Sequence, residues 1–195
     1  KTAYAGPSLP NPSSFIGLLR SKTGIDFDLP SEAQWEFACR AGNGEGRLGD
    51  GSLISSANAY RISRCSGNPE FIYKYFDGDE KYRTAAASLD TSYGTDYVGN
   101  HAPNDWGIYD MHGNVAELTN GHWPGITYAT TDVRVDDVGQ VTESWGQWGY
   151  RIARGGDWND PASFCLIPRR GVNLNYERAA FGFRLCWRFE TPPIE

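Results

Sequence analysis

Two carboxylates flank a short turn in the middle of the chain and could together hold a metal ion. Asp110 and Glu117 enclose the Gly113-Asn114 turn in the segment YDMHGNVAEL. Backbone carbonyls of such a turn can converge with the two side chains, and calcium prefers a mixture of carboxylate and carbonyl oxygens. The spacing does not follow the EF-hand pattern. A solvated turn without a metal is therefore the alternative interpretation.

Two further carboxylates and a thiol lie close together near the C-terminus, at Asp157, Asp160 and Cys165. Two neighbouring carboxylates can act as general acid and base if their surroundings separate their pKa values, and two solvated aspartates are the alternative. Cys165 is a candidate catalytic thiol, but no neighbouring histidine would activate it. The pattern therefore favours a buried or disulfide-bonded cysteine.

The composition of the chain argues against several other kinds of site and partner. The four cysteines allow three disulfide pairings, and none forms a CxxC pair typical of zinc sites. Eighteen basic and 24 acidic residues give a net charge of −6 without a Lys/Arg cluster, so no nucleic-acid partner is expected. No apolar run approaches the roughly 20 residues of a membrane span, and no signal peptide is visible after Lys1. These features indicate a soluble globular chain of one domain.

Two short helices are expected in the first part of the chain. Ser14 precedes an amphipathic run that should end near Gly24. Ser31 should begin a second helix, which places Trp35 and Cys39 on one buried face. Both helices would carry core residues.

Little other regular structure is expected. Residues 1–12 are rich in Pro, Ser and Gly and predict an extended lead-in. Residues 43–107 show no sustained periodicity and predict a long irregular segment, which a compact domain tolerates when cations or disulfides hold it. Short strands are predicted at residues 150–154 and 181–189.

Four blocks occur in order between Leu29 and Trp187: LPSEAQWEFACRAG, APNDWGIYDMHGNVAE, RIARGGDW and FGFRLC. Through them the sequence resembles the formylglycine-generating enzyme family, the sulfatase-modifying-factor domain. The resemblance implies an α+β fold over residues 1–195, a variant of the C-type lectin fold with a few short helices, a small mixed sheet and little regular structure. The family's N-terminal block, a strand with a GxFxMG-like motif, is not found. That part of the domain is expected to be missing from this chain or to bind it as a separate piece.

The resemblance also implies two structural calcium ions. The first would bind the side chains of Asp110 and Glu117 and the carbonyls of Gly113 and Val115, with Asn114 in the same turn. The second would bind the Asn58 side chain, the Ala59 carbonyl, Asp90 and the Ser92 carbonyl.

The resemblance breaks at the redox centre. Oxidising members bind Cu(I) with two cysteines five residues apart and convert the cysteine of a Cys-x-Pro-x-Arg peptide to formylglycine. Cys165 matches the second cysteine, but Asp160 stands at the first, and a hard carboxylate is a poor Cu(I) ligand. Asp157 and Ala116 replace a serine and a tryptophan of the oxidases. Copper is therefore not expected, and the substrate groove should differ as well.

Some members of the resembled family have a disulfide near Cys39 and Cys186. That pairing would leave Cys65 with Cys165 and would favour an oxidising, extracytoplasmic or secreted compartment.

The favoured interpretation is a calcium-stabilised binding module that has lost copper-dependent oxidation and holds a peptide, protein or glycan ligand in the former substrate groove. Aromatic, Asn and Arg side chains suit such ligands through stacking and hydrogen bonds. Variable proteins of diversity-generating retroelements use related scaffolds in this way. The alternatives are a formylglycine-generating oxidoreductase, other chemistry in the same cleft, or a paralogue that modulates a true oxidase. The candidate groove residues are Asp157, Trp158, Asn159, Arg169, Arg170, Asn173, Asn175 and Tyr176.

Overall fold

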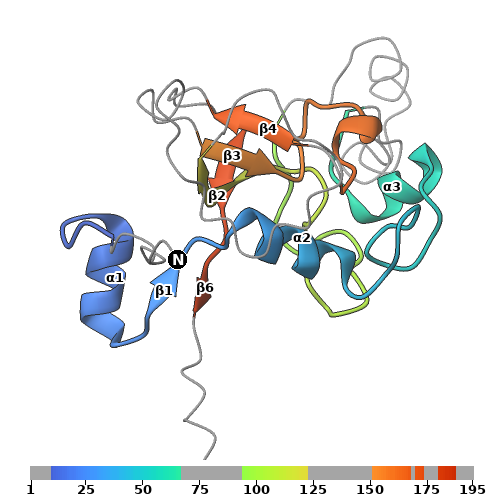
Figure 1. Cartoon of the computed structure of the whole chain (residues 1–195). Helices are drawn as coiled ribbons and strands as arrows, with labels where there is room; N and C mark the ends of the chain where they lie inside the picture. Colours follow the sequence, from blue (N-terminus) through green and yellow to red (C-terminus); the bar gives the residue numbers. More distant parts are fainter. Residues whose placement is uncertain (1–9, 67–93, 123–150, 168–169, 174–179, 188–195) are drawn as a thin grey trace, which may run out of the picture.

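A computed structural model describes residues 10–66, 94–122, 151–167, 170–173 and 180–187 (Figure 1). Within this part of the chain, a few short helices surround two small sheets, which confirms an α+β fold with little regular structure. The elements in chain order are α1 (Phe15–Thr23), β1 (Phe27–Asp28), α2 (Glu32–Arg40), α3 (Ser56–Ile62), β2 (Ala116–His122), β3 (Arg151–Arg154), the 3-10 helix η2 (Ala162–Phe164), β4 (Arg170–Asn173), β5 (Phe181–Phe183) and β6 (Cys186–Trp187).

The first two predicted helices are confirmed with their capping residues. The Ser14 side chain accepts a hydrogen bond from the first turn of α1, and Gly24 ends the helix in the left-handed region with φ 71°. At α2, Ser31 and Gln34 form a reciprocal capping box. Local sequence signals thus determine where both helices begin.

The helix α3 corrects the expectation of an irregular segment over residues 43–107. The Ser55 side chain accepts a hydrogen bond from the backbone N–H of Asn58 and caps this seven-residue helix. Such a short helix lacks the repeated apolar spacing that identifies α2, and packing of Ala59 and Ile62 into the core stabilises it instead.

Four strands form a mixed sheet in the order β4-β3-β2-β5 (Figure 1). The β2–β3 and β3–β4 pairs are antiparallel, whereas β2 and β5 are parallel. In the β3–β4 register, Arg154 lies opposite Arg170, and Arg151 lies opposite Asn173. The predicted strand at 150–154 is confirmed as β3.

The predicted strand at 181–189 is wrong as a single element. It divides into β5 and β6, and β6 pairs with β1 in a separate two-stranded sheet. Arg184 lies between the two strands, where its side chain contacts the buried Glu117, and the chain changes partner from β2 to β1 at this point.

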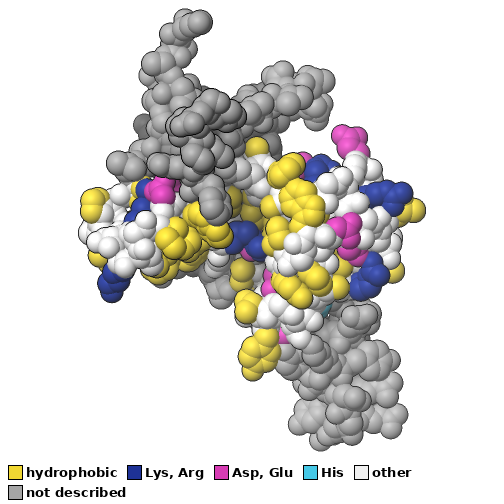
Figure 2. All heavy atoms as spheres, turned by 90° about the horizontal axis from the view of Figure 1, so that it is seen from below, with side chains coloured by type: hydrophobic (Ala, Val, Ile, Leu, Met, Phe, Trp, Pro, Cys, Tyr) yellow, Lys and Arg dark blue, Asp and Glu magenta, His cyan; other side chains and the backbone are white. Residues whose placement is uncertain are grey.

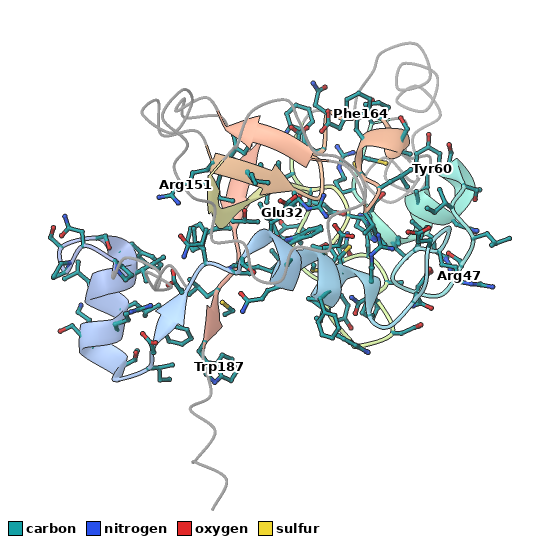
Figure 3. All side chains as sticks on the ribbon, viewed as in Figure 1. Glu32, Arg47, Tyr60, Arg151, Phe164 and Trp187 are labelled. Carbon is teal, nitrogen blue, oxygen red and sulfur yellow. The ribbon has the colours of Figure 1, made fainter. Side chains whose placement is uncertain are left out.

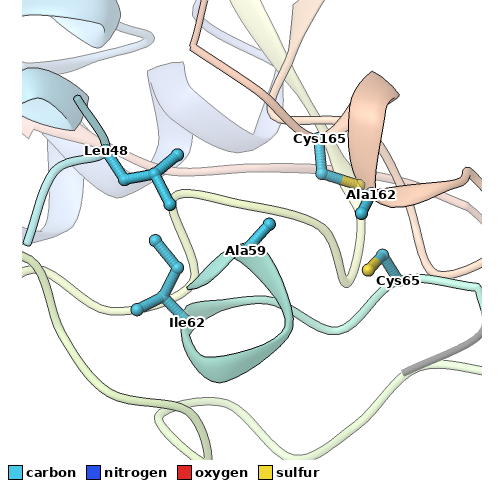
Figure 4. Packing of buried hydrophobic residues seen from close by; sticks show 6 residues of the cluster. All are labelled: Leu48, Ala59, Ile62, Cys65, Ala162 and Cys165. Carbon is cyan, nitrogen blue, oxygen red and sulfur yellow. The ribbon is translucent and has the colours of Figure 1, made fainter. Parts of the chain in front are cut away.

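Two buried clusters form the core of the described part. Trp35 and Cys39 on α2 pack with Met111 and Ile167, which confirms the predicted buried face of this helix. A second cluster joins α3 to η2 and contains two of the four cysteines (Figure 4). Its members are Leu48, Ala59, Ile62, Cys65, Ala162 and Cys165.

The predicted Cys39–Cys186 disulfide is not present, and none of the four cysteines forms a disulfide in the described part of the chain. The Cys39 thiol lies 3.7 Å from the Met111 carbonyl oxygen and 3.6 Å from a His112 ring nitrogen. Cys186 instead lies in the β1–β6 sheet, where its thiol contacts the Asp28 carbonyl. Burial raises the pKa of Cys39 to about 12, so this thiol is a core group rather than a reactive one.

Hydrophobic side chains are also exposed on the face seen in Figure 2. Phe37 of α2 is 66% exposed and meets Trp106 edge-on at 4.9 Å between ring centroids. Phe15 of α1 meets Phe183 of β5 in the same way at 5.7 Å. These contacts connect both helices to neighbouring segments. None of the described helices is long and apolar enough to cross a membrane.

Candidate functional site

The glycines after β3 shape the loop that carries most of the candidate residues. Gly155 and Gly156 have φ values of +92° and +70°, which favour glycine. A Cβ atom on Gly156 would lie 2.9 Å from the Cys165 sulfur and equally close to the Phe164 carbonyl oxygen. Gly156 therefore allows η2 and Cys165 to pack directly against this loop.

The aspartates of this loop bond to its own backbone. An Asp160 carboxylate oxygen accepts the Asp157 N–H at 3.2 Å, and the Asp157 carbonyl accepts the Asp160 N–H at 3.1 Å. The Asp157 carboxylate accepts the Asn159 N–H at 2.8 Å. Both carboxylates thus stabilise the turn. Their proposed acid–base role remains a prediction.

Cys165 is buried beneath this turn. Its thiol hydrogen-bonds Cys65, and this bond together with burial and the carboxylates of Asp160 and Asp157 raises its pKa. The thiol also contacts the Asp157 carbonyl at 3.7 Å. Cys165 therefore stays protonated at neutral pH, and a protonated thiol is neither a good nucleophile nor a good metal ligand.

Part of the predicted groove comes together at one end of the sheet. Asn159 is exposed and Trp158 is half-buried, with its backbone N–H bonded to the Asn114 carbonyl at 3.0 Å. Arg170 begins β4 beside Arg154, the last residue of β3 before this turn.

Among the other groove candidates, one described residue lies away from this end. Asn173 pairs with Arg151 at the opposite end of the β3–β4 ladder, about 10 Å away along the strand. Arg169, Asn175 and Tyr176 lie outside the described residues.

Glu117, a predicted calcium ligand, forms a buried ion pair. Its two carboxylate oxygens accept hydrogen bonds from Arg184 at 2.5 and 2.6 Å, and Trp35 donates a third at 2.6 Å. The same guanidinium donates to the Tyr109 and Asp110 carbonyls, at 3.2 Å each. A positive group thus lies between Asp110 and Glu117, where the resemblance implies calcium.

Calcium at the first predicted position remains a prediction, and in this arrangement Arg184 provides the positive charge beside Glu117. Arg184 engages both Glu117 oxygens, and an Asp110 carboxylate oxygen accepts the Gly99 N–H at 2.7 Å. Gly113 does lie close by, in a β-bridge with Arg64, and Val115 follows in the same turn. Among the described His, Cys, Asp and Glu side chains, no group of three could hold a metal.

The second predicted calcium site falls partly outside the described residues, which do not include Asp90 and Ser92. Of its other members, the Asn58 amide donates to the Leu53 carbonyl at 2.8 Å, and the Ala59 carbonyl accepts the Ser63 hydroxyl at 2.6 Å. A calcium ion at this second position remains a prediction.

Removal of calcium by a chelator can distinguish binding at the first predicted site from binding at the second. We expect EDTA to change the melting temperature of the wild type and of Asp110→Gly by the same amount, because Arg184 rather than calcium neutralises Glu117. Glycine suits the φ of +56° at this position and removes the carboxylate. A larger effect of EDTA on the wild type, measured by differential scanning calorimetry, would show that Asp110 binds calcium.

Two residues that organise this region, Arg184 and Cys65, carry no local sequence signal for the contacts that they make. Arg184 lies within the block FGFRLC at a polar position of an alternating pattern, so nothing nearby in the sequence singles it out. Cys65 comes from a segment without periodicity, and no local pattern indicates that it lies beside Cys165.

Comparisons with known proteins agree with the fold. A family model of the sulfatase-modifying factor enzyme 1-like domain matches residues 3–189. The formylglycine-generating enzyme of Thermomonospora curvata is 29% identical over 162 residues, which cover 80% of this chain and 48% of that enzyme. The enzyme of the same name from Streptomyces coelicolor is 28% identical over 137 residues, covering 70% and 38%. The chain thus spans less than half the length of these relatives.

Two solved structures are also similar. Treponema denticola variable protein 1 has a TM-score of 0.58 and 26% identity, and the match covers 82% of this chain and 46% of that one. PvdO from Pseudomonas aeruginosa has a TM-score of 0.59 and 24% identity, covering 89% and 57%. The second likeness concerns the fold alone.

Proposed function

Because the chain belongs to the sulfatase-modifying factor enzyme 1-like family, we propose that it keeps the family fold as a binding module and does not oxidise a substrate cysteine. The ligand is a peptide, protein or glycan, held by the end of the sheet that carries Trp158, Asn159 and Arg170.

One observation carries this proposal: Cys165 is buried against Cys65, which raises its pKa, while Asp160 bonds to its own turn. The family's Cu(I) site needs two thiolates, one at each of these positions. A carboxylate at the first position and a raised thiol pKa at the second both oppose Cu(I) binding. This chain therefore lacks, at these two positions, the thiolate ligands that the family's copper site requires.

The surface beside the turn supports ligand binding. Asn159 is exposed, and Phe164 on η2, labelled in Figure 3, is 44% exposed. An aromatic ring on η2 and an amide on the preceding turn can stack on and hydrogen-bond a sugar ring or a peptide.

Peptide and glycan arrays would test this proposal, followed by titration of the strongest array probe. We expect Asn159→Ala to reduce the affinity for that probe by about tenfold, because an exposed side-chain contact is lost. The hydrogen bond from the backbone N–H of residue 159 to Asp157 remains. Glu45→Ala, also at an exposed position, is the matched control and should bind as the wild type does. No binding on either array, or equal binding by Asn159→Ala, would contradict the proposed site.

Formylglycine generation is the second candidate function. The names of the two curated relatives favour it. It would require a redox centre built differently from the cysteine pair of the family, since Asp160 occupies the first position.

A further inference from the structure

Cys65 and Cys165 are far apart in the sequence and adjacent in the fold. Cys65 follows α3, and Cys165 follows η2 in the same buried cluster (Figure 4). Next to them, the Ser66 N–H donates to the Asp160 carbonyl at 2.8 Å, and Ser66 forms a β-bridge with Pro161. Backbone bonds therefore hold the two cysteine-bearing segments against each other.

The two thiols differ in their proton affinity. Cys65 accepts hydrogen bonds from the Cys165 thiol and, at 3.3 Å, from the Ser63 hydroxyl. These bonds and the neighbouring Arg64 lower the Cys65 pKa, against burial and the Asp160 charge. The pKa of Cys165 is raised instead. The neighbouring Arg64 and the donated hydrogen bonds thus favour the anionic form at Cys65 over that at Cys165, and such an asymmetry directs oxidation to one partner.

We infer that Cys65 and Cys165 are a peroxide-reactive dithiol that closes to a disulfide between the end of α3 and η2. Cys65 is the attacking thiolate and Cys165 is the resolving thiol. This site is independent of the proposed ligand-binding surface and of copper.

The reaction consumes one hydrogen peroxide. The Cys65 thiolate attacks a peroxide oxygen, the O–O bond breaks, and Cys65 becomes a sulfenic acid while hydroxide leaves. That hydroxide takes the Cys165 proton and becomes water. The Cys165 thiolate then attacks the Cys65 sulfur and expels a second hydroxide, which a solvent proton converts to water. The two sulfurs lose two electrons in total, and the peroxide oxygens gain them.

Burial should make the reaction selective for small oxidants. Cys65 is 0% exposed and Cys165 is 1% exposed, in a packed cluster. Hydrogen peroxide is close to water in size, whereas cumene hydroperoxide needs the cluster to open. We expect cumene hydroperoxide to react at least about tenfold more slowly, since close-packed interiors admit little beyond water.

Mass spectrometry with thiol alkylation tests the inference on the whole chain. After hydrogen peroxide treatment, we expect a mass lower by two hydrogen atoms and one cross-linked peptide pair containing Cys65 and Cys165. The melting temperature should rise, because a disulfide that closes a long loop restricts the unfolded chain. A cross-link through Cys39 or Cys186, or a wild type that leaves both thiols free to alkylate, would overturn the inference.

Two variants test the order of the steps. Cys165→Ser keeps a hydroxyl donor beside Cys65, so a sulfenic acid should accumulate at Cys65 and be trapped by dimedone once urea has opened the cluster. Cys65→Ser should leave Cys165 unoxidised at the same peroxide concentration. Cys186→Ser is the matched control and should form the disulfide as the wild type does. Dimedone labelling at Cys165 in Cys65→Ser would reverse the assigned roles.

Discussion

Replacing Gly113 with alanine is expected to destabilise the fold by more than about 4 kcal/mol, enough to leave much of a typical domain unfolded. A Cβ atom there would lie 2.1 Å from the Arg64 carbonyl oxygen and 2.7 Å from its carbon. These are backbone atoms held by hydrogen bonds, since the Arg64 carbonyl accepts the Asn114 N–H at 2.7 Å. The overlap therefore cannot be relieved by rotation of a side chain. Urea denaturation would measure the loss in unfolding free energy.

Gly107→Ala is the matched control for that substitution. Gly107 has φ +76° against +72° at Gly113, but nothing lies within 4 Å of its added Cβ. The Gly107→Ala variant should lose only about 1 kcal/mol of unfolding free energy, which is the cost of alanine in a left-handed conformation. Equal losses for the two variants would show that the Gly113–Arg64 approach is not close.

Arg184→Met is expected to reduce the unfolding free energy by about 3 kcal/mol, because it leaves the Glu117 carboxylate buried without its cation. The Glu117 side chain is 7% exposed and that of Arg184 is 25% exposed. Methionine retains much of the arginine's apolar length, so the loss reports the charge and the hydrogen bonds. Thermal and urea denaturation would measure it.

The double variant Arg184→Met with Glu117→Gln provides the control. Because the double variant has no buried charge, its loss of unfolding free energy should be smaller than the sum of the losses in the two single variants. The unfolding free energy of Arg184→Lys should lie between those of the wild type and Arg184→Met, because lysine keeps the charge but not the bidentate contact with both oxygens. Additive losses in the double variant would mean that the two side chains do not interact.

Local signals in the sequence predicted the parts of the fold that depend on neighbouring residues. Ser14, Gly24 and Ser31 cap helices through hydrogen bonds within a few residues, so their positions could be recognised in advance. The burial of Trp35 and Cys39 followed from helical spacing. The short helix α3 could not be recognised in this way, because tertiary packing rather than periodicity stabilises it.

The candidate site was predictable only in part. The loss of the paired cysteine at Asp160 follows from the sequence alone, since a carboxylate cannot replace a thiolate for Cu(I). The pairing of Glu117 with Arg184 could not be predicted, because it joins segments that are distant in sequence. Cys65 and Cys165 were paired only as the cysteines that a Cys39–Cys186 disulfide would leave, and they are neighbours although that disulfide is not formed. The spacing of Asp110 and Glu117 in the sequence suggests a calcium site, but it does not reveal that Arg184 lies between them in the fold.

The measurement that tests the proposed function most directly is mass spectrometry of a Cys-x-Pro-x-Arg peptide after aerobic incubation with this protein and Cu(I). The formylglycine-generating enzyme of Thermomonospora curvata serves as the working control. We predict no conversion of the peptide cysteine beyond that in a sample without protein, because Asp160 and the protonated Cys165 do not form the family's copper site. Conversion to formylglycine by this chain would contradict the account and identify an oxidase with a different redox centre.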